Sequence, residues 1–451
     1  MKVTVKEIRI GIKHTSLPIL LLILSFLPFG SKQEFAFAGH EETQTVASGP
    51  SEPAPQDTDG KYHTPLAGEP FRLNFMGRSI VIPVRDRGNL TSLELGGAFY
   101  SPDLANTTSV PLFALFMRRT WEEARLRIVA SGVVNEADGA KSFGHSELLA
   151  RFENYTIPFS EKGFLRNQEV DESSVKWGTL SGFLGFGLRY PVAPYQVDND
   201  LRLQVLGRVG YLYSKETTET GPDVRLPPDT MLYGLKLRGR YDGIRRNLME
   251  LPHRGVAAGF DLDFVYRENW ADYGNRAITF KKEDTRDYPR LSGYLVGAFG
   301  IPGLSEKNRL VASVHGGYIG KESADRYNAF RLDGGPFAEE TDDLCRPNYP
   351  GALSTETLMS KYLLVNLEYR RELLPFLYLE LRGAFIWGDR STIIALNQIG
   401  FKGDSGQTAA LALTSGFLWK SQLYIEYAWD TGFLRDGKAG SSVTLLWSKA
   451  F

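Results

Sequence analysis

The sequence predicts an all-β fold: a transmembrane antiparallel β-barrel of about sixteen strands in the outer membrane of a diderm bacterium. Three observations favour this fold class. Apolar and polar residues alternate with a period of two through much of residues 71–451, which is the pattern of strands with one apolar face. Glycine and aromatic residues are abundant, with 46 Gly, 27 Phe and 21 Tyr among 451 residues. The N-terminal residues carry the pattern of an export signal.

The composition excludes several classes of function. Lys and Arg number 52 against 53 Asp and Glu, so there is no basic excess of the kind that nucleic-acid binding needs. The single cysteine excludes an internal disulfide and a cysteine-based zinc site. The six histidines form neither an HExxH motif nor a close pair. We therefore expect no cofactor, no metal site and no enzymatic activity.

Residues 1–38 are predicted to be a cleaved signal peptide. Basic residues within 1–16 precede an apolar run over residues 17–29, and Ala-Phe-Ala at 36–38 supplies the small-residue cleavage pattern. The alternative is a membrane anchor, but this run of 13 residues is short, because a spanning helix needs about 20. No later segment reaches about 18 consecutive apolar residues, so no helical span is expected downstream.

Residues 39–70 are predicted to be a disordered linker. Five prolines occur between residues 50 and 70, and six acids but only one base lie between residues 41 and 69. Such a segment cannot bury enough apolar surface to offset the entropic cost of ordering it. The barrel is then expected to occupy residues 71–451.

The last strand shows the clearest alternation. Val443, Leu445, Trp447 and Phe451 lie on one face, and small or polar residues lie on the other. Trp447 and Phe451 are therefore assigned to the strand that closes the barrel. The same period of two recurs over residues 258–270, 362–371, 376–387 and 423–430.

A soluble β-sandwich and a transmembrane barrel share this alternation. The candidate strands are often 10–13 residues long, and a tilted strand needs about 9–11 residues to cross a bilayer. Tyr, Trp and Phe recur at strand ends, as in an interfacial aromatic girdle. Charged residues on the polar face, such as Glu368 and Arg382, suit a water-filled lumen. These features favour the barrel.

Sixteen candidate strands can be counted between residues 91 and 451, with twelve or fourteen as alternatives. An even number with antiparallel neighbours is the rule for bacterial outer-membrane barrels. The candidate strands centre near residues 96, 114, 127, 152, 183, 207, 236, 264, 294, 313, 330, 365, 381, 413, 426 and 446.

Three motifs lie at the turns and loops between these strands. The sequence DGIRRN over residues 242–247, followed by PHRG over residues 252–255, connects expected strands seven and eight. The sequence LDGGP over residues 332–336, followed by RPNYPG over residues 346–351, connects expected strands eleven and twelve. The run VNLEYR over residues 365–370, which contains Glu368, opens strand twelve.

In order and position, these motifs resemble the BamA/TamA-type surface-antigen superfamily of outer-membrane protein assembly and two-partner secretion. The resemblance covers residues 91–451 and implies a divergent member without periplasmic polypeptide-transport-associated (POTRA) domains. The implied turn motif consists of Asp242, Arg245, Asn247, Pro252 and Gly255.

Several residues depart from the family pattern. The turn has one extra residue, and Arg246 stands where the family usually has aspartate. The loop sequence is R-P-N-Y rather than R-G-Y, and Trp387 occupies roughly the place of a family aspartate. The chain is therefore expected to be a distant relative within this superfamily.

The resemblance implies that the loop with Arg346, Tyr349, Pro350 and Gly351 folds back into the barrel. Arg346 would then donate a bidentate hydrogen bond to an inward carboxylate, for which Glu368 is the best candidate. Tyr349 would pack on the inner wall. The alternative is a surface loop of polar and turn residues in which Arg346 is solvated.

A basic arc is expected on the inner face of neighbouring strands, formed by Arg202, Arg208, Lys236, Arg238 and Arg240. Such an arc would select anionic solutes. Asp261 and Asp263 are expected beside it, so local neutralisation of the charges is the favoured interpretation.

Two functions follow from these observations. The resemblance implies a barrel that inserts or translocates a polypeptide or lipid-linked client through a lateral seam between its first and last strands. The alternative is a passive diffusion channel for small solutes, which the charged lumen favours. The expected partners are the outer-membrane lipid bilayer, a client polypeptide and a periplasmic partner, with no nucleic acid.

Overall fold

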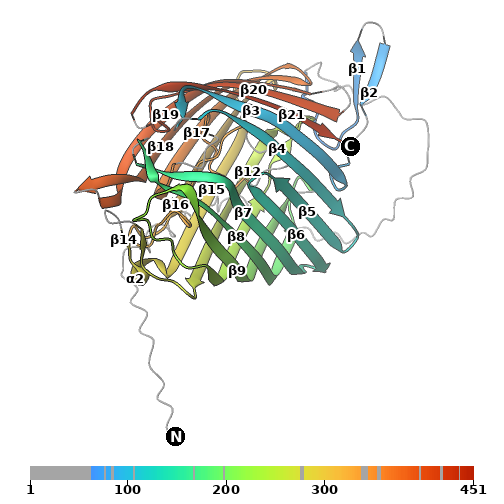
Figure 1. The fold of residues 1–451 in the computed structure, drawn as a ribbon. Coiled ribbons are helices and arrows are strands. Elements are labelled where there is room, and N and C mark those ends of the chain that lie inside the picture. The colour runs from blue at the N-terminus through green and yellow to red at the C-terminus, as the bar shows by residue number, and fades with distance from the viewer. Residues whose placement is uncertain are drawn as a thin grey trace. The chain divides into compact units, whose positions relative to one another are not determined.

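The computed structural model is a closed antiparallel β-barrel (Figure 1). It describes residues 62–75, 78–82, 86–104, 107–165, 168–196, 199–274, 279–336, 344–352, 357–395, 398–416, 420–435 and 437–451. Sixteen strands form the wall: β3 (Leu90–Leu104), β4 (Thr107–Thr120), β5 (Ala124–Ser131), β6 (Val134–Phe143), β7 (Ser146–Leu165), β8 (Gln168–Pro191), β9 (Asp200–Thr220), β10 (Thr230–Asp242), β12 (Pro252–Arg267), β15 (Asp287–Gly300), β16 (Asn308–Tyr318), β17 (Met359–Leu374), β18 (Leu377–Ala395), β19 (Gln398–Gly416), β20 (Ser421–Asp430) and β21 (Gly440–Ala450).

The remaining elements are short. A hairpin of β1 (Phe71–Phe75) and β2 (Arg78–Ile82) precedes the barrel. The connections between wall strands contain β11 (Arg245–Arg246), β13 (Tyr273–Gly274), β14 (Thr279–Phe280) and the helix α2 (Lys282–Thr285). Within the ranges given above, no helix has the length and apolar character needed to cross a membrane.

The alternation of apolar and polar residues separates the two faces of the wall as predicted. In β20, Leu423, Ile425, Tyr427 and Trp429 point outward and are 36–52% exposed. The residues between them point inward and are at most 3% exposed. An apolar outer face is what a barrel presents to lipid. The prediction of an all-β antiparallel barrel with sixteen strands is therefore confirmed.

The barrel closes where β21 pairs with β3 through ten residue pairs, from Ser441 opposite Ser101 to Ala450 opposite Ser92. Figure 1 shows these two strands side by side. The backbone N–H of Phe451 donates to the Thr91 carbonyl at 2.8 Å. Gly96 is required at this seam, because a Cβ there would overlap the carbonyl oxygen of Leu445.

Two strand assignments were wrong and offset each other in the count. No strand forms near residue 330, because Phe330 and Leu332 are buried among the loop residues between β16 and β17. The strand β6 was missed, since its outward positions include Asn135, Gly139 and Lys141 and give no apolar alternation.

Because β6 was not predicted, one motif lies one strand later in the barrel than expected. The turn over residues 242–255 lies between β10 and β12, the eighth and ninth wall strands, and not between the seventh and eighth. The loop over residues 332–351 still lies between the eleventh and twelfth wall strands, β16 and β17.

Part of the expected linker is ordered. Residues 62–69, which we call the docked segment, are tied to the turn between β10 and β12. The Leu248 N–H donates to the Pro65 carbonyl at 2.9 Å, and the Ala67 N–H donates to the Arg246 carbonyl at 3.0 Å. These backbone bonds explain why the end of an acidic, proline-rich stretch is not disordered. The predicted signal peptide, residues 1–38, lies outside the described residues.

Candidate functional site

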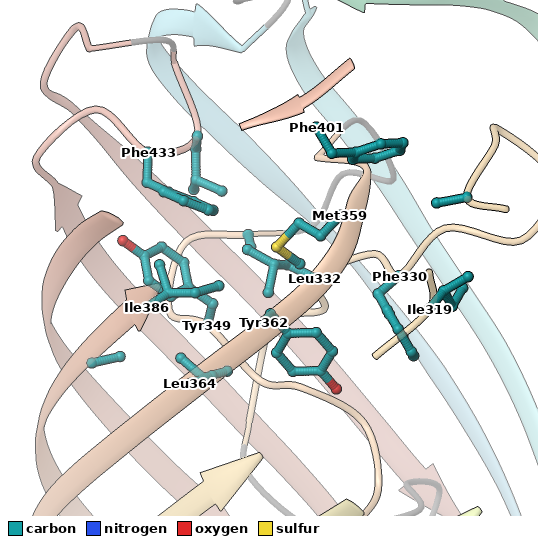
Figure 2. Close-up of a cluster of buried hydrophobic side chains, with 14 of the residues drawn as sticks. Ile319, Phe330, Leu332, Tyr349, Met359, Tyr362, Leu364, Ile386, Phe401 and Phe433 are labelled. Carbon is teal, nitrogen blue, oxygen red and sulfur yellow. The ribbon is translucent and has the colours of Figure 1, made fainter. Parts of the chain in front are cut away.

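The connection between β16 and β17 enters the lumen. We call residues 344–352 the inner loop. Tyr349 is fully buried, and Figure 2 shows its ring beside Ile386 of β18. Its ring centroid lies 6.1 Å from that of Phe433. The Tyr349 N–H donates to the Asp333 carbonyl at 2.7 Å, so the two described halves of the connection are joined to each other.

Wall strands hold the inner loop by polar contacts. Arg382 of β18 donates to the Asn348 side-chain oxygen of the inner loop and, at 3.0 Å, to the carbonyl of Gly335 in the other described half of the connection. The Gly351 N–H donates to Oε1 of Glu426 in β20 at 3.3 Å. The Thr408 hydroxyl of β19 donates to the Pro350 carbonyl at 3.2 Å. Three neighbouring wall strands therefore hold the connection. The loop therefore has a fixed position against this side of the lumen.

The same wall residues form a buried charge network. Arg382 pairs with Glu426 at 2.6 Å and with Glu368 at 3.8 Å. Arg370 pairs with Glu368, and with Glu380 at 3.7 Å. All five residues are at most 6% exposed. Buried pairs add little net stability, but removing one partner leaves a buried charge uncompensated and costs about 3–5 kcal/mol. The network thus fixes geometry more than it stabilises the fold.

The predicted pairing of Arg346 with Glu368 is not what the structure contains. Arg346 pairs with Asp333 at 3.7 Å and with Glu136 of β6 at 3.9 Å, and its side chain is 31% exposed. Glu368 is already compensated by Arg370 and Arg382. The roles are reversed relative to the expectation: the wall supplies the arginine and the loop supplies the acceptors. Sequence reasoning missed Arg382 because nothing in its own strand marks it as a loop partner.

The predicted turn motif builds the connection between β10 and β12. Asp242 accepts the Ile244 N–H at 2.9 Å and pairs with Arg246 at 2.8 Å. The Asn247 side-chain oxygen accepts the N–H groups of Met249 and Leu251, each at 3.0 Å. These are local side-chain to backbone bonds, which stabilise tight turns.

Other residues of the turn motif link it to its surroundings. The Pro252 carbonyl accepts a hydrogen bond from Arg370 at 2.8 Å, so the turn contacts the charge network. Arg245 pairs with Glu69 of the docked segment at 2.8 Å. Gly255 has a φ of +119°, and a Cβ there would overlap the Gly243 carbonyl. The motif therefore acts as a structural junction at one end of the barrel.

We call this end, where β3 begins and β21 ends, the terminal rim. The docked segment crosses it. The Thr64 hydroxyl donates to Glu372 of β17 at 2.7 Å, and Gln196 of the turn after β8 donates to the Ala67 carbonyl at 2.8 Å. The Tyr62 hydroxyl also donates to Glu372. Burial, followed by this hydrogen bond, raises the pKa of Tyr62 well above its ordinary value.

A second anchor holds the start of the β16–β17 connection. Arg267 of β12 binds Asp325 through two hydrogen bonds of 2.5 and 3.2 Å, and both side chains are fully buried. The guanidinium of Arg267 also lies 4.2 Å from the ring centroid of Trp270. The chain is thus fixed at Asp325 before it reaches the lumen.

The opposite side of the lumen contains a cavity of about 530 Å³ near the terminal rim. Most of its lining comes from β4 to β10 and from the turns after β8 and β10, and Arg87, Tyr294 of β15 and Leu344 of the inner loop complete it. Of the expected basic arc, Arg202, Arg238 and Arg240 line the cavity. Asp261 pairs with both Arg238 and Arg240. The remaining members of the arc, Lys236 and Arg208, contact Asp263 and Ser181 respectively.

The described residues contain no group of three His, Cys, Asp or Glu side chains that could hold a metal ion. What the geometry does provide is a loop fixed inside a barrel, a junction at the terminal rim and an arginine-lined cavity. These features define an outer-membrane-type β-barrel with a partly filled lumen.

Solved structures that are similar to this chain share little sequence identity with it. No protein-family model and no curated protein matches the sequence. Among solved structures, CdiB from Acinetobacter baumannii is 10% identical with a TM-score of 0.50, covering 85% of this chain and 65% of its own. BamA from Haemophilus ducreyi lacking POTRA domains 1–3 is 11% identical, with a TM-score of 0.48 and coverages of 85% and 75%. CdiB from Escherichia coli is 12% identical, with a TM-score of 0.44 and coverages of 85% and 67%. At these identities the likeness concerns the barrel fold.

Proposed function

We propose that this protein lies in the bacterial outer membrane and inserts or translocates a polypeptide or lipid-linked client through a lateral opening between β3 and β21. The supporting observation is the position of the inner loop directly behind the closing strand. A Cβ at Gly351 would lie 2.7 Å from the Ser442 hydroxyl of β21. The Gly351 N–H is held by Glu426 of the adjacent strand. The loop then serves as a strut beside the seam.

The chemistry of an open seam suits a polypeptide client. Backbone pairing over ten residue pairs joins β3 to β21, and hydrogen bonds from the Ser441 and Arg435 side chains add to it at one end. If the two strands separate, each presents a row of unpaired N–H and C=O groups, which is a template for adding another strand. A client strand would satisfy these groups in turn, and the inner loop would keep the wall next to the seam in place.

The surroundings of the barrel follow from its surface. The outward apolar residues require a lipid bilayer, and the terminal rim carries short turns of the kind that face the periplasm. A cleaved signal peptide over residues 1–38 would direct export. A periplasmic partner would bring the client to the terminal rim.

The proposal is tested by locking the seam with a disulfide. Phe99 and Val443 face each other across the seam and point outward, and Tyr427 faces the same Val443 from the other side. In a Cys345→Ser background, Phe99→Cys with Val443→Cys locks the seam. Tyr427→Cys with Val443→Cys locks the ordinary β20–β21 pair and is the matched control.

Each variant is expressed in cells depleted of the native protein, and the outer-membrane protein content is measured. We expect depletion to lower that content, the control to restore it, and the seam-locked variant to restore it only after reduction. Equal restoration by both oxidised variants would reject lateral opening.

A passive diffusion channel is the second candidate, and the polar, cavity-containing side of the lumen favours it. Planar-bilayer conductance of the refolded barrel distinguishes the two, measured with and without residues 337–352. A small, flickering conductance that becomes large on deletion supports a strut within the lumen. A steady conductance unchanged by the deletion supports an open pore.

A further inference from the structure

A second cavity, of about 760 Å³, lies at the terminal rim between the docked segment and the rim ends of β12, β15 and β16. We call it the rim groove. The docked segment lines it with Leu66 and Glu69, and the wall lines it with Arg254, Phe299 and Arg309. The rim groove is distinct from the cavity in the lumen, because the two have no described lining residue in common.

Arg254 is a charged residue on the outer face of the wall. It continues the outward row of β12, in which Val256 and Phe260 are 39% and 40% exposed. The Arg254 side chain is exposed, and its guanidinium makes no hydrogen bond or ion pair with another residue in the described ranges. A guanidinium without an acceptor therefore borders the groove at the edge of the apolar outer surface.

Two further arginines of the lining have an N–H group without an acceptor. The Nε atoms of Arg245 and Arg309 are buried and have no hydrogen-bond partner within the part of the chain that the structure describes. The Arg309 side chain is 9% exposed, and its Nη2 lies 2.5 Å from Nε2 of His253 and 3.5 Å from Oε1 of Glu306. These contacts fix the guanidinium but do not involve Nε. Because a buried N–H without an acceptor is costly, an acceptor oxygen bound in the groove would be stabilising.

The acidic residues of the lining are already engaged. Glu69 pairs with Arg245 at 2.8 Å, and Glu306 pairs with Arg309 at 3.5 Å. Arg254 therefore has no acidic partner among the described lining residues. The groove is a concave surface with a positive charge at its outer edge, and such a surface attracts anions.

Apolar side chains lie beside these arginines. Phe299 points outward and is 47% exposed, and Leu66 and Ala298 also line the groove. The groove thus lies where the apolar outer wall ends and the rim begins, which is the depth at which a bilayer places its headgroups. A soluble anion would use only the arginines, whereas an anionic amphiphile would use both kinds of side chain.

We infer that the rim groove binds the phosphate headgroup of a membrane phospholipid. The planar fork of Arg254 suits the oxygens of a phosphate, which arginine binds in bidentate fashion. The acyl chains would follow Phe299 and Val256 along the outer wall. The volume of about 760 Å³ lies within the range of small-molecule sites. The inference rests on the proposed position of the barrel in a membrane and is independent of its client.

The test measures lipid binding to the refolded full chain by native mass spectrometry in a maltoside detergent. The probe is dioctanoyl phosphatidylglycerol, which has an anionic headgroup and short acyl chains. We expect saturable binding of a single lipid, with an affinity that falls about tenfold in Arg254→Gln because hydrogen bonds to a charged group are lost.

Arg371→Gln is the matched control. Arg371 is likewise an exposed arginine near the rim end of a wall strand, β17, but it does not line the groove. This variant should bind the lipid with the affinity of the wild type. Absence of saturable binding by the wild type, or equal affinity in Arg254→Gln and Arg371→Gln, would overturn the inference.

A second substitution of Arg254 separates charge from hydrogen-bond geometry. Arg254→Lys keeps the charge but loses the planar fork, so its affinity should lie between those of the wild type and Arg254→Gln. Heat-modifiable mobility on gels reports the folding of every variant. Because Arg254 has no side-chain partner among the described residues, both variants should fold as the wild type does.

The chain itself is an alternative source of negative charge. Asp57 and Asp59 lie shortly before His63 in the sequence, and His63 lines the groove. If the lipid binds only to Asp57→Asn/Asp59→Asn, the chain supplies its own counter-charge and the inference is wrong. Equal affinity in the wild type and this variant supports a foreign ligand.

Competition distinguishes the two parts of the ligand. Glycerol 3-phosphate has the phosphate without acyl chains, and dioctanoylglycerol has the acyl chains without the phosphate. We expect neither compound to displace dioctanoyl phosphatidylglycerol at equal concentration. Displacement by glycerol 3-phosphate would indicate a site for soluble phosphates, and displacement by dioctanoylglycerol would remove any role for the phosphate. Either result would overturn the inference.

Discussion

Two sides of the lumen are built from the same alternating strands but differ in what their inward charges contact. On the loop side, Arg370 and Arg382 share three buried carboxylates, and Asn348 of the inner loop supplies a further acceptor to Arg382. On the cavity side, arginines outnumber carboxylates and border an open volume. The loop side is therefore a closed core, and the cavity side keeps an open volume lined by arginines. Alternation predicts which residues face inward but not which of these two environments they meet.

The largest effect is expected from breaking the loop side at Arg382. Arg382→Gln leaves Glu426 and Glu368 with less compensation and removes the donor to Asn348 and Gly335. We expect a loss of about 3–5 kcal/mol in the free energy of unfolding, the cost of removing one partner of a buried pair. Urea unfolding of the refolded barrel measures this loss.

The native cysteine reports the loop position in the same variant. Cys345 lies 3.3 Å from Asp261 and is partly buried, so a bulky maleimide should label it faster once the loop is released. Arg371→Gln on the exposed face of β17 is the control and should change neither stability nor labelling. Slow labelling in Arg382→Gln would mean that Tyr349, not Arg382, holds the loop.

Truncating Tyr349 tests that second possibility directly. Tyr349→Ala removes a fully buried ring, which typically costs about 3–5 kcal/mol. The hydroxyl is buried with no hydrogen-bond partner among the described residues, so Tyr349→Phe should be neutral or slightly stabilising. Urea unfolding of both variants checks this difference. A large loss in Tyr349→Phe would show that the hydroxyl, and not ring burial, is what matters.

Removing an arginine from the cavity side should cost far less. In Arg202→Gln, Asp200 keeps Arg189 and Arg125 as partners, and repulsion among three guanidinium groups is relieved. We expect a change below about 1 kcal/mol in the free energy of unfolding, as for partly exposed ion pairs. A loss as large as that of Arg382→Gln would remove the distinction between the two sides of the lumen.

The fold could be predicted from the sequence because of one simple rule: side chains that face the bilayer are apolar, so apolar and polar residues alternate along each strand. The rule failed at β6, whose outer face carries Asn135, Gly139 and Lys141, and at Phe330, whose apolar run is buried inside a loop. The inward-folding loop followed only from the family resemblance. Its true partner, Arg382, depends on how the strands are placed in three dimensions, which no local pattern encodes. The ion pairs of Asp200 with Arg125, Arg189 and Arg202 join residues of β5, β8 and β9, and they were missed for the same reason.

The smallest effect concerns the docked segment, which contacts Glu372 on the loop side and Gln196 on the cavity side. The folded-state pKa of Tyr62 is raised, so its contribution to docking is complete below the unfolded pKa of about 10 and is lost as pH rises above it. A spin label at Pro70→Cys, in a Cys345→Ser background, should become more mobile between pH 9 and 12, as about one proton is released. In Tyr62→Phe this pH dependence should disappear, because the phenyl ring cannot ionise. If the mobility of the spin label still changes with pH in Tyr62→Phe, another group causes the change. The contact of Tyr62 with Glu372 would then not make docking at the terminal rim depend on pH.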